Sequence, residues 1–116
     1  MNTRTARLSD KGEFAAVYNE GRSWANDLVA LRVLPNDLGR SRAGFAVGKR
    51  LGGAVVRNRV RRRLREIVRQ APVKEGWDMV FIARQDAVEA DYSTLRQATE
   101  DLLSRARLLN GGVGAA

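Results

Sequence analysis

Apolar residues recur along this chain at two spacings, and the helical spacing marks three segments. The first predicted helix covers about residues 10 to 20. Asp10 stands where it would cap this helix, with Glu13 three positions on, and Gly21 stands where it would end it. One face of the helix carries the three apolar residues Phe14, Val17 and Tyr18.

Two further helices are predicted downstream. One covers about residues 55 to 70 and is closed by Pro72. The other covers about residues 92 to 109 and is ended by Gly111 and Gly112. Its apolar stripe consists of Leu95, Ala98, Leu102, Leu103, Ala106 and Leu109.

Three other segments have the composition of strands. Residues 24–34 are almost entirely apolar in the middle, which predicts a strand covered on both faces. A second strand is predicted at about residues 42–48 and a third at residues 77–83. Because only a short, turn-rich segment joins the first two strands, we expect them to form an antiparallel hairpin.

This element order, αββαβα, predicts an α+β fold in which helices pack on a small sheet as a two-layer sandwich. A length of 116 residues fits one domain, with residues 1–8 as a basic arm and residues 110–116 as a tail, both expected to be flexible. No run of about 18 apolar residues and no apolar leader segment occurs, so we expect a cytoplasmic location.

The chain contains no Cys and no His. Disulfides, thiolate zinc sites, cysteine nucleophiles and histidine-dependent catalysis are therefore excluded. The carboxylates show no spacing typical of a catalytic pair or a metal site, and Asp78 and Asp86 are interpreted as strand-edge and loop residues. We therefore expect no catalytic residue and no metal site in the protein itself.

The basic residues are concentrated in one part of the chain. Residues 40–69 hold 11 Lys or Arg and the single acid Glu66, a local charge of +10, whereas the other 86 residues sum to −2. Such a local excess attracts a polyanion, either nucleic acid or an anionic membrane. A merely solubilising surface would mix the two signs more evenly, which disfavours that interpretation.

A helical wheel over residues 55–71 separates this charge from a core stripe. The stripe consists of Val56, Val60, Leu64, Ile67, Val68 and Ala71. A basic ridge lies beside it and consists of Arg57, Asn58, Arg61, Arg62, Arg65 and Arg69. Arg59 and Arg63 lie on the other side of the stripe.

The ridge favours nucleic acid over a membrane. Like charges at i, i+4 spacing repel one another, so this helix is typical of a protein whose partner supplies negative charge. Of the 21 basic residues, 18 are Arg, whose guanidinium binds phosphate in a bidentate manner. The apolar stripe has no Trp or Phe and is needed for the core, which argues against membrane insertion.

Two other features leave alternatives open. Phe14 and Tyr18, like Phe45, are more often core residues, but aromatic side chains beside a basic groove also bind single-stranded nucleic acid. The glycine-rich segment 48–53, with Lys49 and Arg50, lacks a P-loop pattern. Its glycines either let backbone amides approach a phosphate or provide a strand-to-helix connection with positive φ.

The run from Gly48 to Arg65 resembles the signature of the bacterial ribonuclease P protein family. Its centre is the Arg57-Asn58-Arg59 motif followed by basic residues at 61, 62 and 65. Other positions resemble the family as well: Arg7-Leu8, then Glu13-Phe14, Val17-Tyr18, Gly21 and Ala25-Asn26, and further on Trp77-Asp78 through Ile82-Ala83-Arg84. Together the resemblance covers about residues 5–107.

This resemblance implies a ribosomal-protein-like α/β sandwich with a left-handed βαβ crossover. It implies the non-catalytic subunit of an endoribonuclease whose RNA uses Mg²⁺ to hydrolyse the phosphodiester that joins the 5′ leader to precursor tRNA. The implied partners are the catalytic RNA and precursor tRNA, with no membrane and no obligate protein partner, and no cofactor bound by the chain itself.

Carried over by position, two sets of site residues follow from the resemblance. The RNA-contacting set is Lys49, Arg50, Arg57, Asn58, Arg59, Arg61, Arg62 and Arg65. The cleft for the leader is lined by Phe14, Tyr18, Asn58, Arg61 and Arg65. Two positions depart from the family pattern: Gly53 replaces an Asn, and Arg32 replaces a cleft Tyr.

Two alternatives remain from the charge pattern alone. A structural ribosomal protein that binds rRNA has the same basic charge and a similar small fold. A helix-turn-helix DNA-binding protein is less favoured, because the element before the basic helix is predicted to be a strand.

Overall fold

The structure is a computed structural model and describes residues 5–110. Its strands are β1 (Ala6–Arg7), β2 (Arg22–Ala25), β3 (Val29–Pro35), β4 (Arg42–Ala46) and β5 (Trp77–Ala83). Its helices are α1 (Lys11–Glu20), α2 (Ala54–Gln70) and α3 (Tyr92–Arg105), with the 3-10 turns η1 (Lys49–Leu51) and η2 (Gln85–Ala87). The predicted α+β class is confirmed. No helix among these residues is long and apolar enough to cross a membrane.

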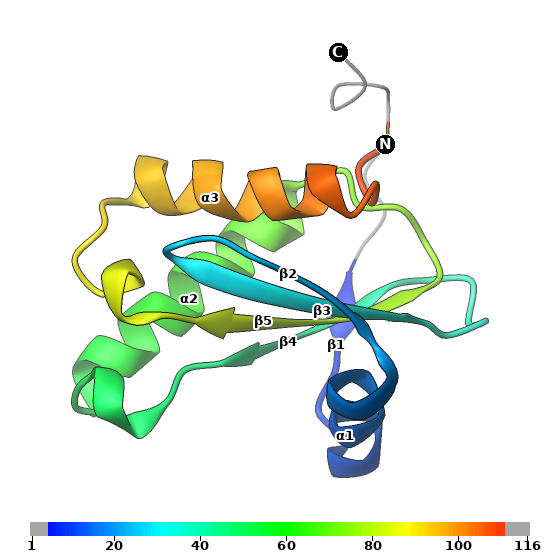
Figure 1. The fold of residues 1–116 in the computed structure, drawn as a ribbon, viewed down its shortest axis with the longest axis horizontal. Helices are drawn as coiled ribbons and strands as arrows, with labels where there is room; N and C mark the ends of the chain where they lie inside the picture. Colours follow the sequence, from blue (N-terminus) through cyan, green and yellow to red (C-terminus); the bar gives the residue numbers. More distant parts are fainter. Residues whose placement is uncertain (1–4, 111–116) are drawn as a thin grey trace.

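The five strands form one mixed sheet in the order β1-β4-β5-β3-β2. Helices α2 and α3 cover one face and α1 covers part of the other (Figure 1). The largest apolar cluster lies between the sheet and α2 and α3, and a smaller one under α1 contains Leu8, Val17 and Val80.

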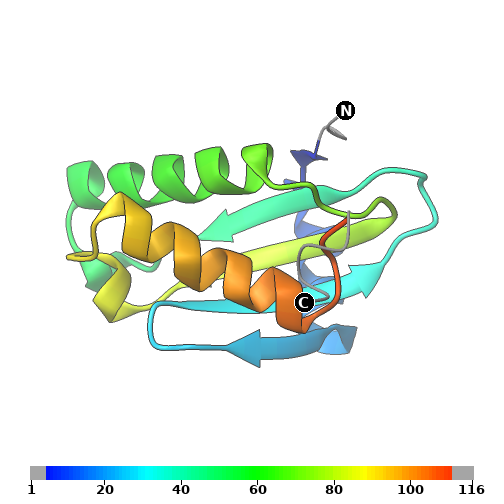
Figure 2. The same ribbon diagram turned by 90° about the horizontal axis from the view of Figure 1, so that it is seen from above.

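Strand β5 occupies the centre of the sheet, antiparallel to β3 and parallel to β4. The connection from β4 through α2 to β5 is therefore a parallel crossover. Seen from the helix side in Figure 2, it moves from β4 to β5 in the left-handed sense, as the family resemblance predicts. This hand is rare among such units.

The predicted hairpin between residues 24–34 and 42–48 is wrong. Strand β5 lies between those two segments in the sheet. Its seven residues, Trp77–Ala83, are mostly buried, which suits a central strand with a neighbour on each side. The actual hairpin lies within the first segment, where β2 pairs with β3. The Asn26 side-chain carbonyl accepts hydrogen bonds from the amides of Leu28 and Val29 and forms the turn.

Two end positions also differ from expectation. Residues 5–8 of the predicted flexible arm are part of the fold, since β1 pairs with β4 and Leu8 is buried. Helix α3 ends at Arg105, because Arg107 adopts a φ of 62° and the Leu108 amide donates to the Leu103 carbonyl. Residues 1–4 of the arm and 111–116 of the tail, with Gly111 and Gly112, lie outside the described residues.

Candidate nucleic-acid interface

Helix α2 is held to the sheet by the stripe that the wheel predicts. Val60, Leu64, Ile67, Val68 and Ala71 are all buried, and Val56 is half-buried. The opposite side of the helix is exposed, and its first turn contains no acidic residue. Arg62 lies on this exposed side, whereas Arg61 and Arg65 flank the stripe on one side and Arg59 and Arg63 flank it on the other.

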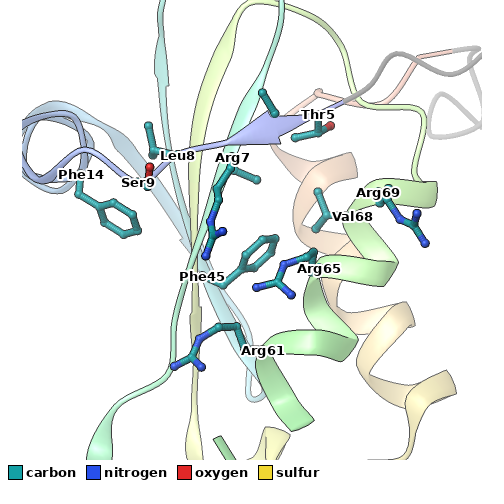
Figure 3. A pocket seen from close by; sticks show the side chains of 12 residues that line it. Thr5, Arg7, Leu8, Ser9, Phe14, Phe45, Arg61, Arg65, Val68 and Arg69 are labelled. Atoms are coloured by element: carbon teal, nitrogen blue, oxygen red, sulfur yellow. The ribbon is translucent and has the colours of Figure 1, made fainter. Parts of the chain in front are cut away.

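One flank of α2 borders a cavity of about 660 Å³. Edge strand β1 and the segment after it form the opposite wall, β4 forms the floor, and Phe14 of α1 closes one end. The lining residues are Thr5, Ala6, Arg7, Leu8, Ser9, Phe14, Ala43, Phe45, Arg61, Arg65, Val68 and Arg69. In Figure 3 the Phe45 ring lies between the side chains of Arg7 and Arg65.

The two aromatic residues of the cavity are fixed by packing. Phe45 stacks on Phe81 with ring centroids 5.6 Å apart. Phe14 occupies the space that a side chain at position 44 would need, since a Cβ at this position would collide with the Phe14 ring. Glycine at position 44 therefore lets Phe14 lie directly against β4.

Three of the five predicted cleft residues line this cavity: Phe14, Arg61 and Arg65. Tyr18 lies next to it, with its ring centroid 6.4 Å from that of Phe14, and the Arg32 guanidinium lies 5.8 Å from the Tyr18 ring centroid. Asn58 does not line the cavity, but its side-chain oxygen accepts a 2.8 Å hydrogen bond from Arg61 and so orients that guanidinium.

The cavity also contains residues that the sequence prediction missed. Arg7, Phe45 and Arg69 line the cavity, although the predicted cleft includes neither arginine and the sequence does not distinguish a core role from a cleft role for Phe45. Arg7 lines the cavity because β1 places it beside β4. A strand of only two residues is too short to show the alternation of apolar and polar residues by which a strand is predicted from sequence. Arg69 lies one turn beyond Arg65, so helical spacing was a usable signal for that residue.

The other predicted RNA-contacting residues lie outside the cavity, on η1 and along α2. Lys49 and Arg50 are exposed on η1, and Arg62 is exposed on the helix. The Arg57 Nε donates to the Gly52 carbonyl at 3.0 Å, which ties the ridge to the glycine-rich segment. Gly52 has a φ of 149°, so this segment does serve as a connection that requires glycine.

The second flank of α2 faces the segment between β5 and α3 and not the cavity. Arg63 donates to the Ala90 carbonyl at 3.2 Å, and Arg59 approaches the Val88 carbonyl at 3.5 Å. The Arg59 Nε is buried without a hydrogen-bond partner among the described residues. Arg59 belongs to the predicted RNA-contacting set, but its side chain does not line the cavity.

Arg42 forms an ion-pair network beneath α1. It donates to both Asp78 oxygens at 2.7 and 2.8 Å and to Glu13 at 2.9 Å, and Asn36 also donates to Asp78. Burial raises the pKa of Asp78, but the hydrogen bonds from Arg42 and Asn36 outweigh it and leave that pKa below its usual value. Hydrogen bonding to Asp78 raises the pKa of Arg42 despite the opposing effect of burial.

This network changes two expectations. Asp78 lies in the central strand and is only 5% exposed, so its interpretation as a strand-edge residue was wrong. The charge of Arg42, which was counted in the basic segment, is neutralised within the protein. Among residues 5–110, no three acidic, Cys or His side chains gather where they would hold a metal ion.

Comparison with known proteins gives concordant matches. The sequence model of the family "Ribonuclease P" matches residues 2–107. The ribonuclease P protein component of Roseiflexus castenholzii is 45% identical over 113 residues, which cover 95% of this chain and 93% of that protein. The corresponding protein of Symbiobacterium thermophilum is 47% identical over 106 residues, covering 89% of this chain and 92% of that protein.

Solved structures show the same similarity. The RNase P protein of Staphylococcus aureus matches with a TM-score of 0.83 at 29% identity, covering 92% of this chain and 100% of that one. The RNase P protein of Thermotoga maritima, solved in complex with 1-(4-fluorophenyl)-2-thiourea, matches with a TM-score of 0.80 at 32% identity. That match covers 85% of this chain and 98% of the Thermotoga maritima chain.

Proposed function

The chain belongs to the ribonuclease P protein family, and from this premise we propose that it binds the catalytic RNA of ribonuclease P and the 5′ leader of precursor tRNA. Family membership replaces the ribosomal-protein and DNA-binding alternatives that the charge pattern left open. In this proposal the RNA subunit carries out the phosphodiester hydrolysis with Mg²⁺, and the protein positions the substrate. We further propose that it acts in the cytoplasm, together with its RNA partners.

The proposal that the protein binds the 5′ leader rests on the cavity between β1, β4 and α2. Its aromatic residues Phe14 and Phe45 offer faces on which bases stack without strong sequence preference. Its guanidinium groups, from Arg7, Arg61 and Arg65, offer bidentate hydrogen bonds to phosphates. A site of this composition suits the single-stranded leaders of many different tRNAs.

The exposed basic residues of η1 and α2 outside the cavity support the proposal that the catalytic RNA binds here. Lys49, Arg50 and Arg62 extend the positive surface beyond the cavity and onto the glycine-rich connection. A structured RNA presents its phosphates over a wide area, so this exposed surface suits it better than the narrower cavity does. In this arrangement one helix contacts both RNAs.

Reconstitution with the cognate catalytic RNA tests the proposal. At low Mg²⁺, the protein should accelerate precursor cleavage and should bind precursor tRNA with a leader more tightly than the leaderless product. The protein without RNA should cleave neither. Equal affinity for the two tRNAs would overturn the leader assignment, and failure to bind the catalytic RNA would overturn the proposal as a whole.

A further inference from the structure

Helix α1 is attached to the sheet through a small apolar contact. Val17 is the only buried residue within Lys11–Glu20, and the cluster beneath the helix adds Leu8 and Val80. Apolar contacts have no direction, so a contact of this size holds the helix against the sheet without fixing its rotation about its own axis. The rotation matters because Phe14, which lines the cavity, extends from this helix.

An ion pair supplies the direction that the apolar contact lacks. Glu13 of α1 accepts a 2.9 Å hydrogen bond from Arg42, which lies on β4. The Arg42 guanidinium cannot turn freely, because its other N–H groups donate to both oxygens of Asp78 at 2.8 and 2.7 Å. Asn36 also donates to Asp78, at 2.8 Å. The N–H group that contacts Glu13 is therefore held at a fixed place relative to the sheet.

This ion pair lies next to the contact between the Phe14 ring and β4. Glu13 and Phe14 are consecutive residues of α1. On β4, Arg42 and Gly44 are two residues apart and therefore lie on the same face of the sheet. The Phe14 ring lies against Gly44, where a side chain would collide with it. A rotation of α1 that breaks the ion pair would thus move the Phe14 ring away from β4.

As a stabilising contact the Glu13–Arg42 pair contributes little. The Glu13 side chain is 40% exposed, and water screens ion pairs at such exposure. Electrostatics also disfavours an acid at this place, because a carboxylate next to a basic cavity repels a polyanion. The effect of the pair on the position of Phe14 is therefore the contribution that the geometry supports.

We propose that Glu13 is a positioning residue for the 5′ leader: its ion pair with Arg42 sets the rotation of α1 and keeps the Phe14 ring against β4, where the ring stacks on a base. The inference rests on the proposed function, because it takes the ligand of the cavity to be the leader. Glu13 itself contacts no RNA in this proposal. It acts through Phe14, which makes the contact.

A double-mutant cycle in the reconstituted holoenzyme tests this role. The parent, Glu13→Ala, Phe14→Leu and the double variant are each titrated with leader-bearing precursor tRNA and with leaderless tRNA. The readout is the ratio of the two dissociation constants, which isolates the contribution of the leader to affinity. Glu20→Ala is the matched control, because Glu20 is an exposed acid at the other end of the same helix. Chemical denaturation checks that each variant folds.

We expect the two single variants to weaken leader binding to different extents. Phe14→Leu should reduce the contribution of the leader about tenfold, within the range for one stacked base, and Glu13→Ala should reduce it about threefold, because the ring is present but less well held. Glu13→Ala should cause no further loss in the Phe14→Leu protein, and Glu20→Ala should cause no loss. The sign is decisive, because removal of an acid by itself would strengthen RNA binding.

The outcomes separate this inference from the proposed function. If the leader contributes to affinity but Glu13→Ala binds it as the parent does or more tightly, the positioning role is overturned and the proposed function stands. A loss that persists in full in the Phe14→Leu protein also overturns the role, because Glu13 would then act through another group. If the leader contributes nothing in the parent, both fail.

A second pair of variants decides if Glu13→Ala does not fold. Glu13→Gln and Glu20→Gln each replace one carboxylate by an amide of the same size. Weaker leader binding with Glu13→Gln alone supports the positioning role, and equal affinities of the two variants overturn it.

Discussion

The two flanks of α2 carry the same residue type in different surroundings. The cleft flank, defined by Arg61, Arg65 and Arg69, borders a cavity whose other walls hold no carboxylate. The loop flank, defined by Arg59 and Arg63, lies against the carbonyls of Val88 and Ala90. An arginine whose N–H groups donate to backbone carbonyls stabilises the fold. An arginine that lines the open cavity still has N–H donors available for a ligand. Basic charge alone therefore overstates the surface that RNA would contact.

Arg42 forms ion pairs only within the protein, and its replacement should have the largest effect on stability. Arg42→Met should lower the free energy of unfolding by about 3 to 5 kcal/mol, because the buried Asp78 carboxylate is left without its cation. Chemical denaturation measures this loss. Simultaneous Asp78→Asn should restore part of the stability, and a single variant as stable as the parent would contradict the buried ion pair.

Leu64 lies in the stripe between the two flanks and is fully buried. Leu64→Ala should lower the free energy of unfolding by about 2 to 5 kcal/mol, because it leaves a cavity beneath α2. Arg62→Ala on the exposed side of the same helix is the matched control and should change stability by less than about 0.5 kcal/mol. Equal losses in the two variants would mean that the stripe and the flanks are wrongly assigned.

Acid should weaken the same network without a mutation. The pKa of Asp78 is lower in the folded state than the unfolded value of about 3.9, so the folded state favours the carboxylate. Its stabilisation is complete above the unfolded pKa and is lost as the pH falls through the folded pKa. The free energy of unfolding should therefore decrease below about pH 4. Asp78→Asn should reduce this dependence but leave the part due to Asp91, whose pKa is lowered by hydrogen bonding from the Thr94 amide.

Local chemistry made much of the fold predictable from sequence. The Asp10 side chain accepts from the Glu13 amide and caps α1, and the predicted third strand has the bounds that β5 has. The hairpin was misassigned because strand pairing depends on partners far apart in the chain. The strand that separates β3 from β4 lies more than 30 residues beyond β4. The turn at Asn26 within an otherwise apolar run was the local signal that would have divided it.

The candidate site was predictable on the helix and less so elsewhere. Helical spacing assigned Arg61 and Arg65 to one flank and Arg59 and Arg63 to the other, because rotation per residue is fixed within a helix. It gave no information on what each flank faces. The place of Arg7 depends on a two-residue strand, and that of Phe14 depends on glycine at position 44, about thirty residues away. Both contacts require the assembled sheet.

Arg61→Ala on the cleft flank should weaken binding of leader-bearing precursor tRNA to the holoenzyme by about tenfold, the size of one lost hydrogen bond to a charged group. The slope of log K against log salt should fall in magnitude by about 1, because one phosphate contact is lost. Titrations at several salt concentrations measure both quantities. A loss of affinity with an unchanged salt slope would argue that Arg61 acts through packing and not through a phosphate.

Arg63→Ala on the loop flank should give the smallest effect and the sharpest contrast with Arg61→Ala. Loss of the hydrogen bond to the Ala90 carbonyl should cost about 0.5 to 1.5 kcal/mol in stability, because that carbonyl is partly buried. Leader affinity and its salt slope should stay at the parent values, since the side chain points away from the cavity. If Arg63→Ala instead lowers the salt slope as Arg61→Ala does, the loop flank also contacts RNA. The division of α2 into two functional sides would then be wrong.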